Sequence, residues 1–240
     1  MGILSLFSKK KTSLKDSGVL DGFKDCHTHI LPGVDDGVKT IEDSLKILAY
    51  NEALGVSELW CTPHVMDDLV NKTEMLRERF ASLQQAYTGP IRLHLGAEYM
   101  LDQEFEQRLQ DDDLIPLWDD VVLVETSAQV PPFNLLEILE NILRKGYRPM
   151  MAHPERYRYM QMADYRHLHS LGVYFQLNLG SLAGFYGESV QKTALQLLKA
   201  GLYTAAGSDC HRLVSLDSQY QRPVISPDTI SALKHISGVQ

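Results

Sequence analysis

Cysteine is scarce in this chain of 240 residues, which contains only Cys26, Cys61 and Cys210. An odd number without a Cys-x-x-Cys pair excludes a disulfide framework and argues against a structural zinc site made of thiolates. We therefore expect a reducing compartment, the cytoplasm. Cys210 as a nucleophile is disfavoured because no Cys-x5-Arg loop follows it, and small buried packing residues need no further role.

Long hydrophobic runs and an excess of positive charge are also missing. No apolar run approaches the ~20 residues that a membrane-spanning helix needs, so we expect a soluble protein. The 23 Lys and Arg residues are outnumbered by 31 Asp and Glu residues, which gives a net charge of −8. This balance argues against a broad electrostatic grip on nucleic acid. The length and the 44% hydrophobic content suit one large domain.

The first residues differ in composition from the remainder. An apolar tip at residues 1–7 precedes Lys9, Lys10 and Lys11, the reverse of the order in a secretory signal. We expect residues 1–21 to form a flexible basic and apolar extension, and residues 22–240 to form the folded domain. A minority interpretation is weak contact of residues 1–11 with an anionic membrane surface.

From residue 23 onward, short apolar runs alternate with amphipathic stretches, which is typical of parallel βα units. The expected strands are residues 23–27, 56–61, 91–95, 121–124, 148–152, 173–177 and 202–206. Helices are expected between residues 40 and 55 and at residues 76–87, 135–143, 164–171 and 188–200. Residues 99–118 receive no assignment. Seven units rather than eight predict an α/β fold of the distorted (β/α)7 TIM-like barrel type.

Residues able to bind a metal ion recur where the expected strands end. These candidates are His27, His29, Asp36, His64, Glu98, Glu125, His153, Asp209 and His211. In αβ barrels the loops after the strands build the active face, so these side chains should converge. Imidazole and carboxylate ligands together suit zinc, manganese and iron. Nine ligands exceed the needs of one ion, so we expect two or three ions held by a bridging carboxylate.

Each candidate ligand, considered alone, could also be an ordinary surface or packing residue. A single His-x-His is a weak signal that a polar surface turn could equally produce, and His94, His167, His169 and His235 are expected to be surface or packing residues. The recurrence across separate units favours the metal site. Glu98 and Glu125 follow hydrophobic runs, where an unpaired carboxylate would be costly unless a cation lay nearby.

The ordered motifs resemble the polymerase-and-histidinol-phosphatase (PHP) superfamily, and within it the bacterial metal-dependent protein tyrosine phosphatases of the CpsB/YwqE type. The resemblance runs from about residue 25 to residue 212. It rests on His-Thr-His at 27–29, Val-Asp-Asp-Gly at 34–37, Thr-Pro-His at 62–64, Glu98, Glu125, His-Pro-Glu-Arg-Tyr at 153–157 and Asp-Cys-His at 209–211.

This resemblance implies a distorted (β/α)7 barrel with a three-metal centre, with manganese expected first and iron or zinc as alternatives. By position, the first ion would be held by His27, His29, Glu98 and Asp209; the second by Glu98, Glu125 and His153; and the third by Asp36, His64 and His211. Substrates of such enzymes are phosphotyrosine proteins, in particular tyrosine kinases that control exopolysaccharide or capsule production.

Three residues are expected to take part in catalysis. Arg156 matches the phosphate-binding arginine of the resemblance, and a guanidinium can contact two phosphate oxygens at once. The alternative for Arg156 is a salt bridge with Glu155. Arg212 could assist, on weaker grounds, and either His64 or a metal-held water could protonate the leaving tyrosinate.

Two rival functions remain. One is a small-molecule phosphoesterase of the same superfamily, for example one acting on histidinol phosphate, which a deep enclosed pocket would favour. The other is a non-catalytic scaffold that binds metal. The full set of candidate ligands argues against the scaffold, because a scaffold has no physical need for so many charged groups at one face.

Overall fold

A computed structural model of the chain describes residues 11–69 and 71–236. The strands are β1 (Lys24–Thr28), β2 (Glu58–Cys61), β3 (His64–Val65), β4 (Arg92–Leu95), β5 (Glu98–Met100), β6 (Val121–Glu125), β7 (Arg148–Ala152), β8 (Tyr174–Asn178) and β9 (Ala205–Gly207). The helices are α1 (Ile41–Ala53), α2 (Thr73–Ala86), α3 (Gln103–Asp111), α4 (Leu135–Arg144), the 3-10 turn η1 (Pro154–Arg156), α5 (Met162–Ser170), α6 (Leu179–Leu182), α7 (Glu188–Lys199), α8 (Leu213–Tyr220) and α9 (Pro227–Leu233).

The strands form two parallel sheets, one in the order β1-β2-β4 and the other in the order β3-β5-β6-β7-β8-β9. Two chain segments pass from the first sheet to the second. β2 continues after Thr62 and Pro63 as β3, and β4 continues after Gly96 and Ala97 as β5. The register is kept across both breaks, since Cys61 pairs with Leu95 and His64 pairs with Glu98.

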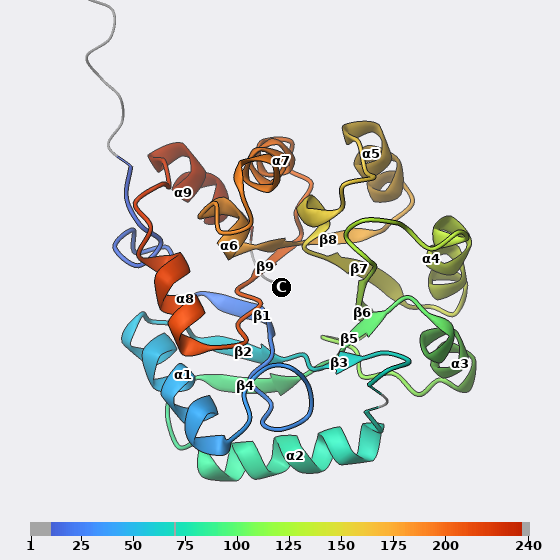
Figure 1. The fold of residues 1–240 in the computed structure, drawn as a ribbon, viewed down its shortest axis with the longest axis horizontal. Helices are drawn as coiled ribbons and strands as arrows, with labels where there is room; N and C mark the ends of the chain where they lie inside the picture. Colours follow the sequence, from blue (N-terminus) through green and yellow to red (C-terminus); the bar gives the residue numbers. More distant parts are fainter. Residues whose placement is uncertain (1–10, 70, 237–240) are drawn as a thin grey trace, which may run out of the picture.

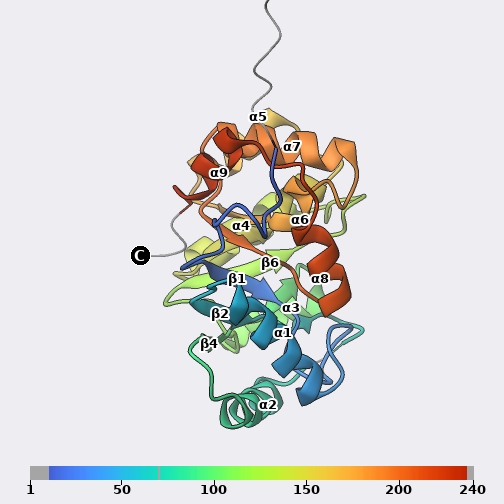
Figure 2. The ribbon, with the colours of Figure 1, turned by 90° about the vertical axis from the view of Figure 1, so that its left-hand side faces the viewer.

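Backbone contacts also join β1 to the segment after β9. The Asp209 amide donates to the His27 carbonyl at 2.8 Å, and the His29 amide donates to the Cys210 carbonyl at 2.9 Å. The helices lie around the outside of the strands (Figure 1), and a turn of 90° shows α2 and α7 at opposite ends of the molecule with strands between them (Figure 2). The predicted α/β architecture of parallel strands is confirmed, with the larger sheet curled.

Successive side chains of a strand point to two different hydrophobic clusters, so both faces of the strands are buried. Val121 and Leu123 of β6 belong to a small cluster that also holds Met150, whereas Val122 and Val124 belong to the main hydrophobic core. Because side chains alternate with period two, one face of each strand contacts the helices and the other contacts the opposite strands. Polar residues on the inner face are therefore directed into the interior.

Several elements differ from the expected ones. β5 and α3 occupy part of residues 99–118, for which the sequence predicts no element. The only apolar residues of α3 are Phe105 and Leu109, which are both buried, so its helical pattern is weak. β9 covers residues 205–207 rather than 202–206. The helix expected after Thr40 is present, and the Thr40 side chain accepts a hydrogen bond from the Asp43 amide, which is the N-cap arrangement.

Part of the N-terminal segment packs against the C-terminal helices. Thr12 pairs with Ile225, the Lys15 amide donates to the Tyr220 carbonyl at 3.0 Å, and Leu14 and Leu20 are buried. A flexible extension was expected over residues 1–21, and residues 12–20 lie against the fold through these contacts. Residues 1–10, which include most of the suggested membrane-contacting segment, lie outside the described residues. None of the helices in the described residues has the length and apolar character to cross a membrane.

Candidate metal centre

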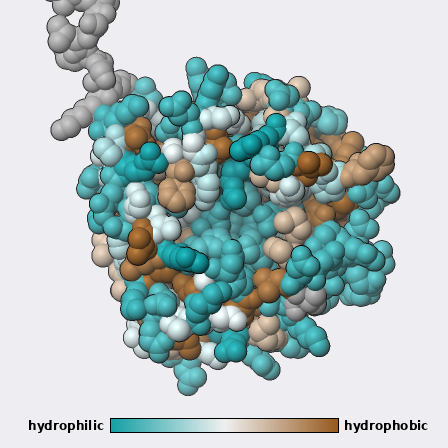
Figure 3. All heavy atoms as spheres, in the orientation of Figure 1, coloured by the Kyte–Doolittle hydropathy of each residue, from teal (hydrophilic) through white to brown (hydrophobic). Residues whose placement is uncertain are grey.

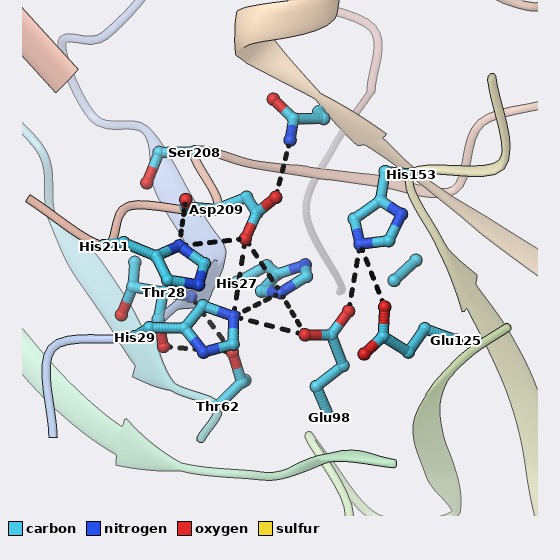
Figure 4. A network of polar contacts seen from close by, with 12 residues as sticks. His27, Thr28, His29, Thr62, Glu98, Glu125, His153, Ser208, Asp209 and His211 are labelled. Carbon is cyan, nitrogen blue, oxygen red and sulfur yellow. Dashed lines mark hydrogen bonds and ion pairs between the residues drawn. The ribbon is translucent and has the colours of Figure 1, made fainter. Parts of the chain in front are cut away.

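The strand ends bring the nine predicted ligands together in one place. His27 lies in β1 and His29 directly follows it, and the loop after β9 contains Asp209 and His211, so these side chains face one another (Figure 4). Glu98 starts β5, Glu125 ends β6 and His153 follows β7. Ligand atoms within 4.8 Å of one another form three groups: His29, Asp36, His64 and His211; His27, His29 and Glu98; and His64, Glu98 and Glu125.

Glu98 lies at the centre of the cluster and is fully buried. Its Oε2 is 3.1 Å from His27 Nε2, 3.2 Å from His29 Nε2 and 3.1 Å from His64 Nδ1. Its Oε1 is 3.0 Å from His153 Nε2. One carboxylate thus faces four imidazoles through two oxygens, which is the position of a bridging ligand.

Glu125 and Asp209 flank Glu98 on its two sides. Glu125 lies 3.2 Å from His64 Nδ1 and 3.8 Å from His153 Nε2. Asp209 Oδ1 lies 3.6 Å from His27 Nε2 and 3.4 Å from His29 Nε2. Carboxylates and imidazoles therefore alternate across the buried part of the cluster.

The remaining candidates form its outer edge. Asp36 Oδ1 is 3.2 Å from His211 Nε2 and 3.5 Å from His64 Nε2. The Asp36 side chain is 71% exposed, whereas that of His64 is 15% exposed. This edge is open to solvent, and a space-filling view shows a hollow over the middle of the strands, surrounded mainly by hydrophilic side chains (Figure 3).

Two residues of the cluster have left-handed backbones. His153 has a φ of 35° and Asp209 a φ of 53°. Such values are uncommon for residues with a Cβ and persist where the surroundings fix them. Asp209 is fixed by the hydrogen bond that its amide donates to the His27 carbonyl, and the amide of the preceding residue, Ser208, donates to the buried Asp25 at 2.8 Å. Local backbone geometry thus aims both ligands inward.

Two polar residues that the sequence did not identify orient the buried histidines. His29 Nδ1 donates to Asp35 Oδ2 at 2.8 Å, and His27 Nδ1 donates to Gln176 Oε1 at 2.9 Å. In a neutral imidazole each bond keeps the proton on Nδ1 and leaves the Nε2 lone pair directed at the cluster, which is how outer hydrogen-bond partners orient histidines in metal sites. Asp35 also accepts from the amide of Gly37, where a Cβ would meet the His29 carbonyl oxygen at 2.0 Å.

The electrostatics of the cluster are strongly coupled. Burial alone would raise the pKa of Glu98, but His27 and His64 outweigh it and hold that pKa well below its usual value. Burial would lower the pKa of His64, yet the carboxylates of Glu98 and Glu125 raise it to about 10. The carboxylates therefore favour the positively charged form of the neighbouring imidazoles, and they would stabilise a bound cation in the same way.

The donor set fits divalent ions. The buried atoms Glu98 Oε2 and His64 Nδ1 form ion pairs but no hydrogen bond among the described residues, and His27 Nε2 lies only 3.1 Å from His29 Nε2. In neutral imidazoles protonated at Nδ1, these two Nε2 lone pairs would repel each other, whereas a shared cation would satisfy both. Buried polar atoms without partners cost free energy unless an ion or water meets them. All three cysteines are buried and free and none belongs to the groups of ligands.

Arg156 lies at the side of the cluster. Its Nη1 donates to Asp209 Oδ2 at 3.0 Å, and its guanidinium lies 4.8 Å from the centre of the Tyr186 ring. The alternative salt bridge with Glu155 is not formed. Glu155 is buried and accepts instead from the Asn178 amide at 3.0 Å and the Tyr203 hydroxyl at 2.9 Å.

Arg212, the third predicted catalytic residue, is exposed before the first turn of α8. Within the described part of the chain, no hydrogen bond or ion pair joins its side chain to the cluster. The structure thus brings the nine ligands and Arg156 together and leaves Arg212 at the rim. His94 is a packing residue as predicted, because its ring stacks on Trp60 and it contacts Glu58 at 2.9 Å.

Known proteins resemble this chain in sequence and in fold. The chain is 31% identical over 196 residues to tyrosine-protein phosphatase YwqE of Bacillus subtilis (strain 168), covering 79% of this chain and 77% of that protein. It is 29% identical over 203 residues to tyrosine-protein phosphatase CpsB of Streptococcus pneumoniae, covering 80% and 84%.

A solved structure is also similar to this chain in fold. It comes from a study of YwqE from Bacillus subtilis and CpsB from Streptococcus pneumoniae, described as unique metal-dependent tyrosine phosphatases. The match has a TM-score of 0.76 at 28% identity and covers 91% of this chain and 89% of that one. The family model for capsular polysaccharide synthesis, CpsB/CapC, matches residues 23–224. The chain therefore belongs to the CpsB/CapC family.

Proposed function

We propose that this protein is a metal-dependent protein tyrosine phosphatase. The observation that carries the proposal is the cluster of nine imidazole and carboxylate candidate ligands that includes the buried Glu98, with the guanidinium of Arg156 beside it. Relatives named as tyrosine-protein phosphatases, YwqE and CpsB, which are both described as metal-dependent, support the same chemistry. The open outer edge at Asp36 suits a protein substrate better than an enclosed pocket would.

The fold that we propose is a distorted (β/α)7 barrel spanning residues 22–240. Counting β2 with β3 and β4 with β5 as single bent strands gives seven parallel strands in the order of the chain. The bridge between Thr28 and Cys210 would close the ring between the last and first strands. A barrel of this kind carries its chemistry at the carboxyl ends of the strands, where the nine ligands lie.

Two or three divalent ions would occupy the cluster, manganese being our first choice and iron or zinc the alternatives. The ligand sets remain those implied by the resemblance: His27, His29, Glu98 and Asp209; Glu98, Glu125 and His153; and Asp36, His64 and His211. The proximity of Glu98 to four imidazoles supports its bridging role. His29 also lies close to the third set.

Such ions would supply Lewis acidity toward the phosphoryl oxygens and a lowered pKa for water. The chain itself would bind and orient the phosphate. Arg156 carries a permanent charge and a forked set of donors, and its bond to Asp209 directs it toward the cluster. Asp209 Oδ2 is shared by Arg156 and the Asn178 amide group, which leaves Oδ1 directed at the histidines.

His64 is the residue that we propose for proton transfer to the leaving tyrosinate, because it lies between the buried ligands and the open edge. Its contacts with Glu98, Glu125 and Asp36 also make it a candidate ligand, and only one of these roles can use a given ring nitrogen. Arg212 would act at most on the approaching substrate, since its side chain is exposed.

The substrate class that we propose is a phosphotyrosine protein, in particular a bacterial tyrosine kinase that regulates exopolysaccharide or capsule production. The family to which the chain belongs supports this assignment. The three buried, free cysteines suit a reducing cytoplasm.

Substrate choice can be tested directly. We would measure phosphate release from a phosphotyrosine peptide, a phosphoserine peptide and histidinol phosphate, each with protein stripped by a chelator and then supplied with manganese. Release restored by manganese and fastest on phosphotyrosine is the expected result. Restored release on histidinol phosphate alone would replace the substrate class and keep the metal site. Metal binding without release from any of the three would contradict an enzymatic function.

A further inference from the structure

A groove lies directly beside the candidate metal centre. It has a volume of about 670 Å³ and runs between the segment after β7 and the first half of α7, and the neighbouring helices α5 and α7 lie side by side at the top of Figure 1. Residues lining it include Arg156, Arg158, Gln161, Tyr186, Lys192 and Thr193. Cavities that hold ligands fall in this range of size.

Arg156 and Tyr186 line the groove, and Arg156 connects it to the metal ligands. Arg156 lines the groove and also donates to Asp209 at 3.0 Å, so it faces both spaces. Tyr186 also lines the groove, and the Arg156 guanidinium lies 4.8 Å from the centre of its ring. A phosphotyrosine whose phosphate met Arg156 would therefore leave its neighbouring residues at the mouth of the groove.

The floor of the groove is held in place by buried polar contacts. Glu155 is buried, and both of its oxygens are occupied, by the Asn178 amide and the Tyr203 hydroxyl. The Tyr165 hydroxyl donates to the Pro154 carbonyl at 3.0 Å. These contacts fix η1 against β8 and α5, so the groove is preformed and a ligand need not order it.

The exposed charge along the groove is predominantly positive. Arg158 and Lys192 are both exposed, and in the described part of the chain neither forms an ion pair. Glu155 is buried and already bonded, so it does not face a ligand as a free charge. Glu188 is the other acidic residue of the lining, and it lies in the first turn of α7, where the helix dipole stabilises a negative charge.

We propose that this groove binds the peptide segment next to the phosphotyrosine and that Arg158 and Lys192 select acidic residues in that segment. The inference rests on the proposed function and adds a preference among phosphotyrosine substrates. Opposite charges across an open groove mainly govern selectivity and are weakened by salt.

Three phosphotyrosine peptides that differ only in their flanks, with glutamate, glutamine or lysine on both sides, test the preference in the manganese-loaded protein. We expect kcat/KM to be about three- to tenfold higher for the glutamate peptide than for the lysine peptide at low salt, which is the scale of a few exposed ion pairs. The ratio should shrink in 0.5 M NaCl, at which screening is strong.

The double variant Arg158→Glu, Lys192→Glu should bring this ratio to one or reverse it. Lys199→Glu is the control, because it reverses one positive charge at the far end of α7 and does not line the groove. Lys199→Glu should keep the ratio of the unmodified protein. Equal kcat/KM for the three peptides in the unmodified protein, or a double variant that retains the preference, would overturn the proposal.

Failure of the proposed function gives a different result. In that case p-nitrophenyl phosphate, which has no flanking residues, would not be hydrolysed either. Fluorescence anisotropy of the labelled glutamate and lysine peptides then measures their affinity for the protein without any need for turnover. Tighter binding of the glutamate peptide that the double variant loses would still support the groove, and equal binding of the two peptides would overturn it.

Discussion

At Arg156, two contacts fix the guanidinium, one with the Asp209 carboxylate and one with the face of the Tyr186 ring. Cation–π contacts contribute from about 0.5 kcal/mol at exposed sites to ~2 kcal/mol when desolvated. We expect Tyr186→Leu to raise the inhibition constant of phosphate by about 3- to 30-fold with bound metal unchanged. Tyr186→Phe keeps the ring and should stay within about twofold of the unmodified protein. Equal phosphate inhibition in both variants would contradict a positioning role for the ring.

Asp35 controls the orientation of a ligand without facing the cluster itself. Its Oδ2 accepts from His29 Nδ1 at 2.8 Å and from the His64 amide at 3.1 Å. Loss of such an outer partner typically lowers metal affinity 10- to 100-fold. We expect Asp35→Ala to weaken manganese binding by about this factor in a competition titration with a chelator. Asp35→Asn keeps an acceptor oxygen and should lose less; an Ala variant that binds as tightly as the unmodified protein would rule out the role.

The convergence of the nine candidate ligands could be predicted because most of them follow an apolar run, so their positions along the chain already suggested one shared face. The outer partners could not be predicted in this way. Gln176 meets His27 across 149 residues of sequence, and a polar residue within a buried strand is equally consistent with a structural hydrogen bond. The strand Tyr-Phe-Gln-Leu-Asn did carry one signal, because Gln176 lies on the inner face while Phe175 and Leu177 pack in the main core.

At the scale of the elements, β9 must approach β1 closely. A Cβ on Gly207 would lie 2.6 Å from His27 Cβ and 2.9 Å from the His27 amide nitrogen, closer than packed atoms tolerate. Overpacking of this kind typically costs about 1–3 kcal/mol. We expect Gly207→Ala to lower the free energy of unfolding by at least this amount, measured by urea denaturation, and to weaken metal binding through His27.

Gly18→Ala is the control for that substitution, since its Cβ would meet nothing within 4 Å and only the positive φ of 69° is strained. If the Gly207→Ala variant is as stable as the Gly18→Ala variant, β1 and β9 are not packed too closely for a methyl group, and the prediction is wrong.

Elements with strong periodicity were predictable, and those interrupted by the site were not. α1 and the strand β6 appear where the apolar spacing placed them. β3 contains only His64 and Val65, so it has too few residues to show alternation, and its first residue is a candidate ligand. β5 likewise begins with Glu98. The breaks between β2 and β3 and between β4 and β5 result from the chain turning to present these side chains.

For the molecule as a whole, charges far from the cluster also affect stability. Glu58 contacts Arg92 at 2.6 Å, His94 at 2.9 Å and Lys24 at 3.3 Å, which links β1, β2 and β4. Burial would raise the pKa of Glu58, but hydrogen bonds from Arg92 and His94 outweigh it and lower it to about 2. A carboxylate with a lowered pKa stabilises the fold above its unfolded pKa of 4.5, and this contribution is lost as the pH falls toward 2.

We therefore expect Glu58→Gln to be less stable than the unmodified protein at pH 7, by about 1 kcal/mol. The difference should narrow as the pH decreases from 4.5 toward 2. Urea denaturation of both proteins in the presence of a chelator, repeated across this range, measures it. A difference that stays constant with pH would show that the carboxylate charge is not responsible.

Phosphotyrosine hydrolysis that depends on divalent ions is the central property proposed for this molecule. The most direct measurement titrates manganese into chelator-stripped protein and follows phosphate release from a phosphotyrosine peptide together with bound metal, for the unmodified protein and for Glu98→Gln. We predict that release rises from background as two or three ions bind and that Glu98→Gln stays at least ~100-fold slower, because Glu98 faces four of the imidazoles. Stripped protein as active as the reloaded protein, or normal turnover by Glu98→Gln, would contradict it.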